Sequence, residues 1–241
     1  MMIAGVLSSA MNAIAGGGSF VSLPALIAAG APPLSANATS TVALLPGSLA
    51  SAWVYRRDLA PIGPASPRSM LGVTLAGGLA GSGLLLATPG SAFETALPWL
   101  LLMATLALAA GPAVSRWLAK HRMTAGGATL LTVQFALGVY GGYFGGAVGI
   151  MMMAAWSLLA GADLKAFQPA RVILVSAANT VAVCVFAVSG VVHWREALLL
   201  GAGALAGGYC GALIARRLPV GVLRVVTVTA CAAVTLLFFL D

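Results

Sequence analysis

Apolar residues run along the chain in long stretches that short polar or glycine-rich segments interrupt. Six of these stretches come near the roughly 20 residues that a helix needs to cross the ~30 Å hydrocarbon core of a bilayer. We predict these six transmembrane helices at about residues 37–55, 69–87, 99–114, 167–189, 197–215 and 225–240. Two further apolar regions, residues 2–29 and 124–160, are each divided by a cluster of glycines and need another interpretation.

The two divided regions contain AGGGSFVSLPALIAAG (15–30) and YGGYFGGAVGIMMMAAWSLLAG (140–161). Backbone that is not helical survives at membrane depth only where protein or a water-filled cavity surrounds it. Broken apolar segments at matching places in two halves of a transporter indicate its substrate site. We therefore interpret 2–29 and 124–160 as hairpins that enter the membrane and return to the same side.

The charges of the loops predict the orientation, because Lys and Arg in short loops favour the cytoplasm. When Arg56, Arg122 and Arg216 are all placed inside, the number of crossings between Arg122 and Arg216 is even. The region 124–160 must then be a hairpin, and the same logic makes 2–29 a hairpin from outside, with Glu94 and Glu196 outside. The expected fold is an all-α integral membrane protein with two inverted repeats, 1–122 and 123–241, each a re-entrant hairpin followed by three transmembrane helices.

The two halves align at an offset of 131 positions, which places Gly18 on Gly149 and Ser40 on Arg171. The same offset places Asn37 on Gln168. Two extra residues in the second glycine cluster are needed to align the remaining glycines. The repeat is therefore predicted from matching breaks and loop order more than from identity.

Composition supports membrane insertion, since 61% of the 241 residues are hydrophobic, 7% are charged and the mean hydropathy is +1.04. Too few polar residues are present to cover a water-soluble globule. The net charge of +7 arises from basic residues that stand singly or in pairs between apolar runs. This pattern is typical of cytoplasmic loops and argues against a nucleic-acid partner.

No catalytic or metal-binding motif is evident. Cys184, Cys210 and Cys231 lie in apolar runs without CxxC spacing or neighbouring histidines, so neither a metal nor another cofactor is expected. Paired acids, an HExxH motif and a nucleophile with its base are all missing, so the protein is not expected to be an enzyme. The carboxylates Asp58, Glu94, Asp163, Glu196 and Asp241 are all predicted in loops or at the end, which argues against a buried proton relay.

Anion binding gives a chemical role to the glycine breaks, because a helix N-terminus offers free N–H groups and a partial positive charge. The second limb of each hairpin starts just after glycines, and both N-termini are expected to point into the middle of the bundle. Polar residues at the starts of two spans complete the candidate site. The candidate substrate-binding residues are Gly17, Gly18, Ser19, Asn37, Thr39, Ser40, Gly146, Gly149, Gln168 and Arg171.

Each candidate also has an alternative structural role. Glycines can allow close helix packing in lipid, as we expect for Gly77-Gly78 and Gly207-Gly208. Asn37 can cap its helix. Arg171, near a helix end, can extend to the lipid headgroups instead of the substrate.

These motifs resemble the TauE/SafE family of sulfite exporters and related anion permeases. The resemblance rests on the first glycine cluster with Pro24, on Gly30-Ala31-Pro32 followed by Ala36-Asn37-Ala38-Thr39-Ser40, and on the second glycine cluster, Gly142 to Gly149. The sequence departs from the pattern at Ala155, where a proline would match Pro24. The resemblance implies a multi-pass protein of the bacterial inner membrane that carries sulfite, a sulfonate or another small oxyanion.

The expected function is therefore transport, in the direction of export, of a small anion bound between the two hairpin tips. The expected partners are this anion and the lipid bilayer, and a homo-oligomer is compatible with the sequence. The alternative is a membrane partner or scaffold for an enzyme of sulfur metabolism that carries nothing itself. The short loops leave little surface for such an enzyme.

Overall fold

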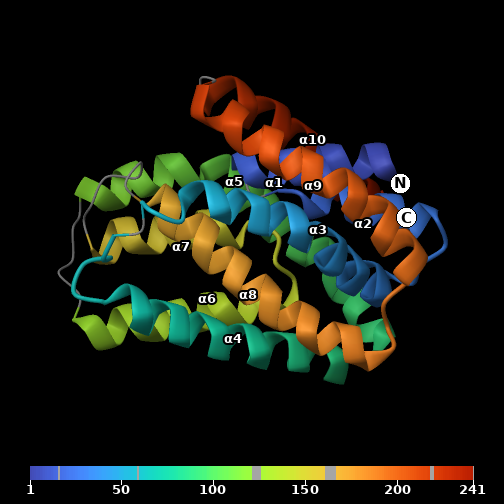
Figure 1. Cartoon of the computed structure of the whole chain (residues 1–241), viewed down its shortest axis with the longest axis horizontal. Helices are drawn as coiled ribbons and strands as arrows, with labels where there is room; N and C mark the ends of the chain where they lie inside the picture. Colours follow the sequence, from blue (N-terminus) through green and yellow to red (C-terminus); the bar gives the residue numbers. More distant parts are fainter. Residues whose placement is uncertain (16, 59, 121–125, 161–166, 218–219, 241) are drawn as a thin grey trace.

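The computed structural model describes residues 1–240 except 16, 59, 121–125, 161–166 and 218–219, and it is built from helices (Figure 1). Lys165 and Arg122 lie outside the described residues. The ten helices are α1 (Met2–Ala15), α2 (Ser19–Ala28), α3 (Pro33–Tyr55), α4 (Pro67–Ala87), α5 (Gly90–Lys120), α6 (Gly127–Tyr143), α7 (Val148–Leu159), α8 (Gln168–Ser189), α9 (Trp194–Arg217) and α10 (Val220–Leu240). The all-helical prediction is confirmed, and each predicted glycine break separates two helices, α1 from α2 and α6 from α7.

Three helix starts were predicted too late because proline and acidic residues were interpreted as loop formers. The predictions that 99–114 ends at 114 and that 225–240 starts at 225 were also wrong, since α5 runs to Lys120 and α10 starts at Val220. Helix α5 begins at Gly90, so Glu94 and Pro98 lie inside it and not in a loop. Pro98 has no N–H to pair with the carbonyl of Glu94, and Glu94 itself is exposed. Likewise Trp194, Arg195 and Glu196 form the first turn of α9.

The third corrected boundary is the start of α3. Pro33 is its first residue, where a missing N–H costs nothing, so the helix starts four residues before the predicted position. Asn37 therefore lies inside the helix, and the alternative that it caps the helix is wrong.

Three described helical segments are long and apolar enough to cross a membrane: Pro67–Ala87, Gly90–Ala110 and Gln168–Ser189. Shorter apolar segments include Met2–Ala13, Ser19–Ala28 and Val148–Leu159 in the two hairpin regions. Helix α3 has 23 residues, but polar side chains lie on its buried face. These side chains are Asn37, Thr39, Ser40, Ser48 and Ser51. A membrane helix that turns a polar stripe inward is expected to line a site.

Close helix packing depends on glycine at two interfaces, between α1 and α9 and between α4 and α6. A Cβ at Gly203 or Gly207 of α9 would clash with the backbone carbonyls of Met2 and Val6 on α1. A Cβ at Gly77 of α4 would lie 2.5 Å from the carbonyl oxygen of Phe135 on α6. The expected packing role of Gly77 and Gly207 is therefore confirmed.

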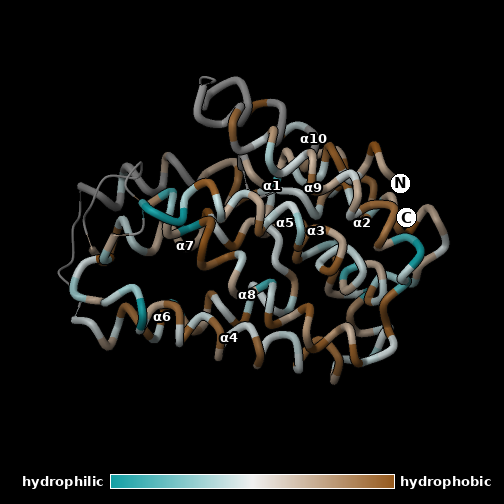
Figure 2. Tube along the Cα trace, viewed as in Figure 1, coloured by the Kyte–Doolittle hydropathy of each residue, from teal (hydrophilic) through white to brown (hydrophobic). Residues whose placement is uncertain are grey.

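The helices run along the long axis of the molecule (Figure 1). Helix α2 lies near the end that holds both chain termini, whereas α7 lies toward the opposite end (Figure 1). Hydrophobic residues are spread over the outer turns of the helices (Figure 2). Exposed side chains such as Leu79, Val188 and Leu198 would be unfavourable in water and suit contact with lipid.

Candidate functional site

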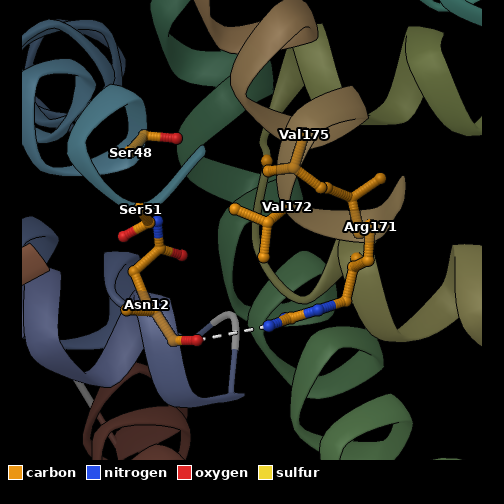
Figure 3. A pocket seen from close by; sticks show the side chains of 10 residues that line it. Asn12, Ser48, Ser51, Arg171, Val172 and Val175 are labelled. Carbon is orange, nitrogen blue, oxygen red and sulfur yellow. Dashed lines mark hydrogen bonds between the residues drawn. The ribbon is translucent and has the colours of Figure 1, made fainter. Parts of the chain in front are cut away.

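A small cavity lies where α1, α3, α8 and the break before α7 meet (Figure 3). Its volume is about 20 Å³, which is room for roughly one water molecule. Side chains of Arg171, Val172 and Val175 from α8 face those of Asn12, Ser48 and Ser51 across it (Figure 3). The remaining lining residues are Ala13, Gly145, Val148 and Gly149.

Arg171 contributes a buried positive charge to this cavity, since only 4% of the residue is exposed. Its Nε donates to Oε1 of Gln168, 3.1 Å away, one turn earlier on α8. Its Nη2 donates to the backbone oxygen of Ala13, 3.2 Å away, near the C-terminal end of α1. Both of these acceptors are neutral, and the two hydrogen bonds use two of the five N–H groups of the guanidinium. The alternative that Arg171 extends to the headgroups is not what the structure shows.

Acidic side chains do not balance this charge among the described residues. Asp58 and Glu94 are exposed and Glu196 is half-buried at the start of α9; none of them lines the cavity. The described residues also hold no cluster of His, Cys, Asp and Glu suited to a metal ion. Among the described residues the hydrogen-bond acceptors of this buried cation are therefore neutral, an arrangement that is costly in a membrane and typical of functional sites.

The second glycine break brings a helix N-terminus to the same cavity. Gly145 has a φ of 78° and Ala147 a φ of 56°, a left-handed geometry in which glycine is favoured. This turn aims the start of α7 at the cavity, because Val148 and Gly149 both line it. The N–H of Ile150 donates to the carbonyl of Ala147 at 3.0 Å, whereas the N–H groups of Val148 and Gly149, at the very start of the helix, have no partner inside it and can act as donors.

Gly149 is also the contact between α7 and the buried arginine. A Cβ at Gly149 would lie 2.9 Å from Cγ and 3.1 Å from Cδ of Arg171. Glycine at this position lets the aliphatic part of Arg171 lie flat on the first turn of α7. Gly146 belongs to the same break, where its carbonyl accepts a hydrogen bond of 3.0 Å from the Tyr140 hydroxyl.

The first glycine break is arranged differently. Gly17 and Gly18 are buried, and a Cβ at Gly18 would lie 2.5 Å from the backbone oxygen of Ser8 and 2.7 Å from Cβ of Asn12. Ser19, half-buried, is the first residue of α2. None of these three residues lines the cavity, although Gly18 packs against Asn12, which does.

The polar residues of α3 divide between several neighbours. Nδ2 of Asn37 donates to the carbonyl of Tyr143 at the end of α6, 3.0 Å away. The Ser40 hydroxyl is 2.5 Å from that of Ser22 on α2. The Thr39 hydroxyl accepts from the backbone N–H of His193 at 3.0 Å, in the turn between α8 and α9. Thus these three residues connect α3 to other helices and do not line the cavity.

Of the ten predicted site residues, Gly149 and Arg171 line the cavity, and Gln168 holds the arginine. Sequence reasoning missed Asn12, Ser48 and Ser51. Asn12 is the one amide in α1, a segment that is apolar apart from it and from Ser8 and Ser9, and this was an available signal. Ser48 and Ser51 follow Pro46-Gly47 three residues apart on one helix face, which was a weaker signal because serine is common in membrane helices.

Comparison with known proteins places the chain in context. A family model described as "Sulfite exporter TauE/SafE" matches residues 1–238. The chain is 27% identical to "Probable membrane transporter protein ORF9" of a Sinorhizobium species, with all of this chain aligned to 92% of that protein. It is 29% identical to a "Probable membrane transporter protein" of Haemophilus influenzae, over 86% of this chain and 81% of that one.

A third relative is "Probable membrane transporter protein YfcA" of Escherichia coli K12, 27% identical over 88% of this chain and 77% of that protein. No solved structure matches the chain at a significant level. The family resemblance inferred from the glycine clusters is confirmed over nearly the whole length. The chain belongs to the TauE/SafE family of membrane transporters.

Proposed function

We propose that this transporter moves a small oxyanion, such as sulfite or a sulfonate, out of the cell and binds it between Arg171 and the first turn of α7. The observation that carries the proposal is the buried guanidinium with two neutral acceptors, next to a helix N-terminus and a cavity. An anion there would gain charge-assisted hydrogen bonds, the stronger class of hydrogen bond in a protein. The amide of Asn12 and the hydroxyls of Ser48 and Ser51 would complete its polar surroundings.

The cavity is too small for the substrate in this conformation. Its volume of about 20 Å³ holds roughly one water molecule, and even the smallest sulfur oxyanion is larger than that. Transport therefore requires opening. The bond from Arg171 to the Ala13 carbonyl connects α8 to the end of α1, so an anion that replaces this carbonyl would free the two helices to separate.

The proposed architecture for this movement is the pair of inverted repeats. Matching contacts support it: Gly208 packs against Gly47, while Gly78 packs against Ala178. The corresponding residues in these two pairs are separated by 130 and 131 positions. The contact of α9 with α3 therefore corresponds to the contact of α4 with α8, so that α4 matches α9 and α3 matches α8 in the repeat.

The first helices of the two proposed hairpins, α1 and α6, also match in their contacts, at a slightly smaller offset in sequence. Gly207 of α9 contacts Val6 of α1, whereas Gly77 of α4 contacts Phe135 of α6. Val6 and Phe135 are separated by 129 positions, which agrees with two extra residues in the second glycine cluster. The ends of the molecule at which α2 and α7 lie, opposite one another in Figure 1, also suit hairpins that enter from opposite faces.

We further propose that the end of the molecule with the α3–α4 connection faces the cytoplasm. Arg56, Arg57 and Arg68 lie at the ends of α3 and α4 there, whereas Glu94 and Glu196 begin helices at the other end. This separation obeys the preference of basic residues for the inside and fits a bacterial inner membrane. A monovalent anion leaving a cell with a negative interior gains about 2.3 kcal/mol per 100 mV, so export can proceed on the membrane potential.

The test is transport by the purified protein in liposomes, with sulfite, sulfate, thiosulfate, sulfoacetate and small carboxylates offered in turn. We expect uptake of at least one sulfur oxyanion and faster movement when the potential favours it. Arg56→Ala is the control for the loss of an arginine charge away from the cavity. Arg56 is exposed, and its Cζ lies 3.8 Å from the centroid of the Trp53 ring. Liposomes that carry none of these anions would contradict the proposal.

A further inference from the structure

We propose that Gln134 is a positioning residue for the anion site, because its side chain fixes α7, the helix whose N-terminus faces the cavity. This inference rests on the proposed function and adds a residue that does not touch the cavity. The evidence for it is a buried network of hydrogen bonds that joins α4, α6 and α7 and is separate from the residues of the proposed anion site.

Both polar atoms of the Gln134 side-chain amide have hydrogen-bond partners. Its Oε1 accepts from Nε1 of Trp156 on α7 at 3.0 Å, and its Nε2 donates to the Thr74 hydroxyl on α4 at 2.8 Å. The same nitrogen lies 3.7 Å from the sulfur of Met152, also on α7. Thr74 in turn donates to the carbonyl of Met70 at 2.7 Å.

All the side chains in this network are shielded from the surroundings, since Thr74, Gln134, Met152 and Trp156 are each 0% exposed. Hydrogen bonds hold their geometry most strongly where water cannot replace them. A shift of α7 along α6 would leave the indole N–H and the amide unpaired, and unpaired buried polar groups are unfavourable. The network therefore holds α7 in one position against α6 and α4.

This position matters because α7 is a single rigid helix of 12 residues. Met152 lies one turn after Val148, whose side chain lines the cavity, and Trp156 follows one turn later. A displacement at Trp156 is thus carried directly to Val148 and Gly149, and through Gly149 to Arg171. The distance between the α7 N–H groups and the guanidinium depends on this distant amide.

The first hairpin has no side-chain amide at the position that matches Gln134. At the repeat offsets, Gln134 corresponds to Gly5 and Thr74 to Ala204. Gly5 packs directly against the backbone of α9, where a Cβ would lie 3.1 Å from the nitrogen of Ala204. Backbone contact joins α1 to α9 at Gly5, whereas in the second half the hydrogen bond from Gln134 to Thr74 adds to the backbone contact of α6 with α4.

The test compares Gln134→Leu with Gln134→Glu in sulfite transport and in sulfite-dependent thermal stabilisation. Leucine removes every hydrogen bond, whereas a glutamate buried in the membrane is protonated and can still accept from Trp156 and donate to Thr74. We expect Gln134→Leu to raise the half-saturating sulfite concentration about tenfold. The maximal transport rate should fall by a smaller factor. Gln134→Glu should recover most of the affinity.

The matched control is Thr235→Val, which breaks the buried hydrogen bond of 2.8 Å between Thr105 and Thr235 of α5 and α10. This variant should lower the melting temperature without changing the sulfite affinity. Wild-type affinity in a folded Gln134→Leu variant, or an equal loss of affinity in Thr235→Val, would overturn the positioning role alone. A wild-type protein that neither binds nor carries any of the offered anions would overturn the proposed function, and the positioning role with it.

Discussion

The two glycine breaks share a sequence pattern but differ in what lies opposite them. At the first break Gly18 packs on the backbone of α1, and the neutral hydroxyls of Ser22 and Ser40 meet beside it. At the second break Gly149 packs on the aliphatic part of Arg171, and the cavity opens next to it. Ser40 and Arg171 occupy the same position in the proposed repeat. The comparison shows that the glycines allow close approach at both breaks, while the residue on the following span decides what meets them, a neutral hydroxyl at the first break and the proposed anion-binding guanidinium at the second.

The largest expected effect comes from removing the charge at the second break. Arg171→Ala should weaken sulfite binding about 10- to 100-fold, because it removes charge-assisted hydrogen bonds. Arg171→Lys should restore part of the affinity, since it keeps the charge but loses the planar guanidinium. Half-saturating concentrations in liposomes measure both effects, and equal values in all three proteins would show that the charge serves another purpose.

Valine at the two matching glycines should separate binding from folding. Gly149→Val meets the side chain of Arg171, which can move away, so this variant should fold and lose transport. Gly18→Val meets the backbone oxygen of Ser8 at 2.5 Å, which cannot move without displacing α1, so its yield of folded protein should fall. Size-exclusion profiles and transport rates measure the two outcomes. A well-folded Gly18→Val variant with no transport would give the first break a binding role.

A smaller effect is expected at Asn12, whose amide faces Arg171 across the cavity (Figure 3). Asn12→Ala should raise the half-saturating sulfite concentration about fivefold, the effect of one neutral hydrogen bond. Ser22→Ala provides the comparison at the first break, where affinity should stay within about twofold of the wild type. The reverse order of the two effects would place the anion at the first break.

Sequence reasoning recovered the parts of this molecule that follow from strong physical constraints. Glycine clusters in apolar surroundings predicted both helix breaks, and a lone charge in an apolar run identified Arg171, because few other environments tolerate either. Helix ends were less predictable. Pro33, Pro98 and Glu196 are compatible with loops and with helix interiors or first turns, and only packing decides between them.

The lining of the cavity depends on contacts between distant segments and was only partly predictable. Asn12 and Ser48 lie on helices of the first half, and no local pattern indicates that they face Arg171. Thr39 and Ser40 had the right chemistry for anion binding, yet each has a hydrogen-bond partner elsewhere in the bundle, the backbone of the half-buried His193 and the hydroxyl of the buried Ser22. Hydroxyl groups in membrane helices satisfy one another readily, so their presence alone does not identify a site.

The central claim is that the anion binds at the second break through Arg171. The most direct measurement is the melting temperature of purified wild-type, Arg171→Ala and Ser40→Ala proteins, each titrated with sulfite and thiosulfate. We predict that the anion raises the melting temperature of the wild type and of Ser40→Ala by similar amounts and leaves that of Arg171→Ala unchanged. Full stabilisation of Arg171→Ala together with its loss in Ser40→Ala would contradict the account and place the anion at the first break.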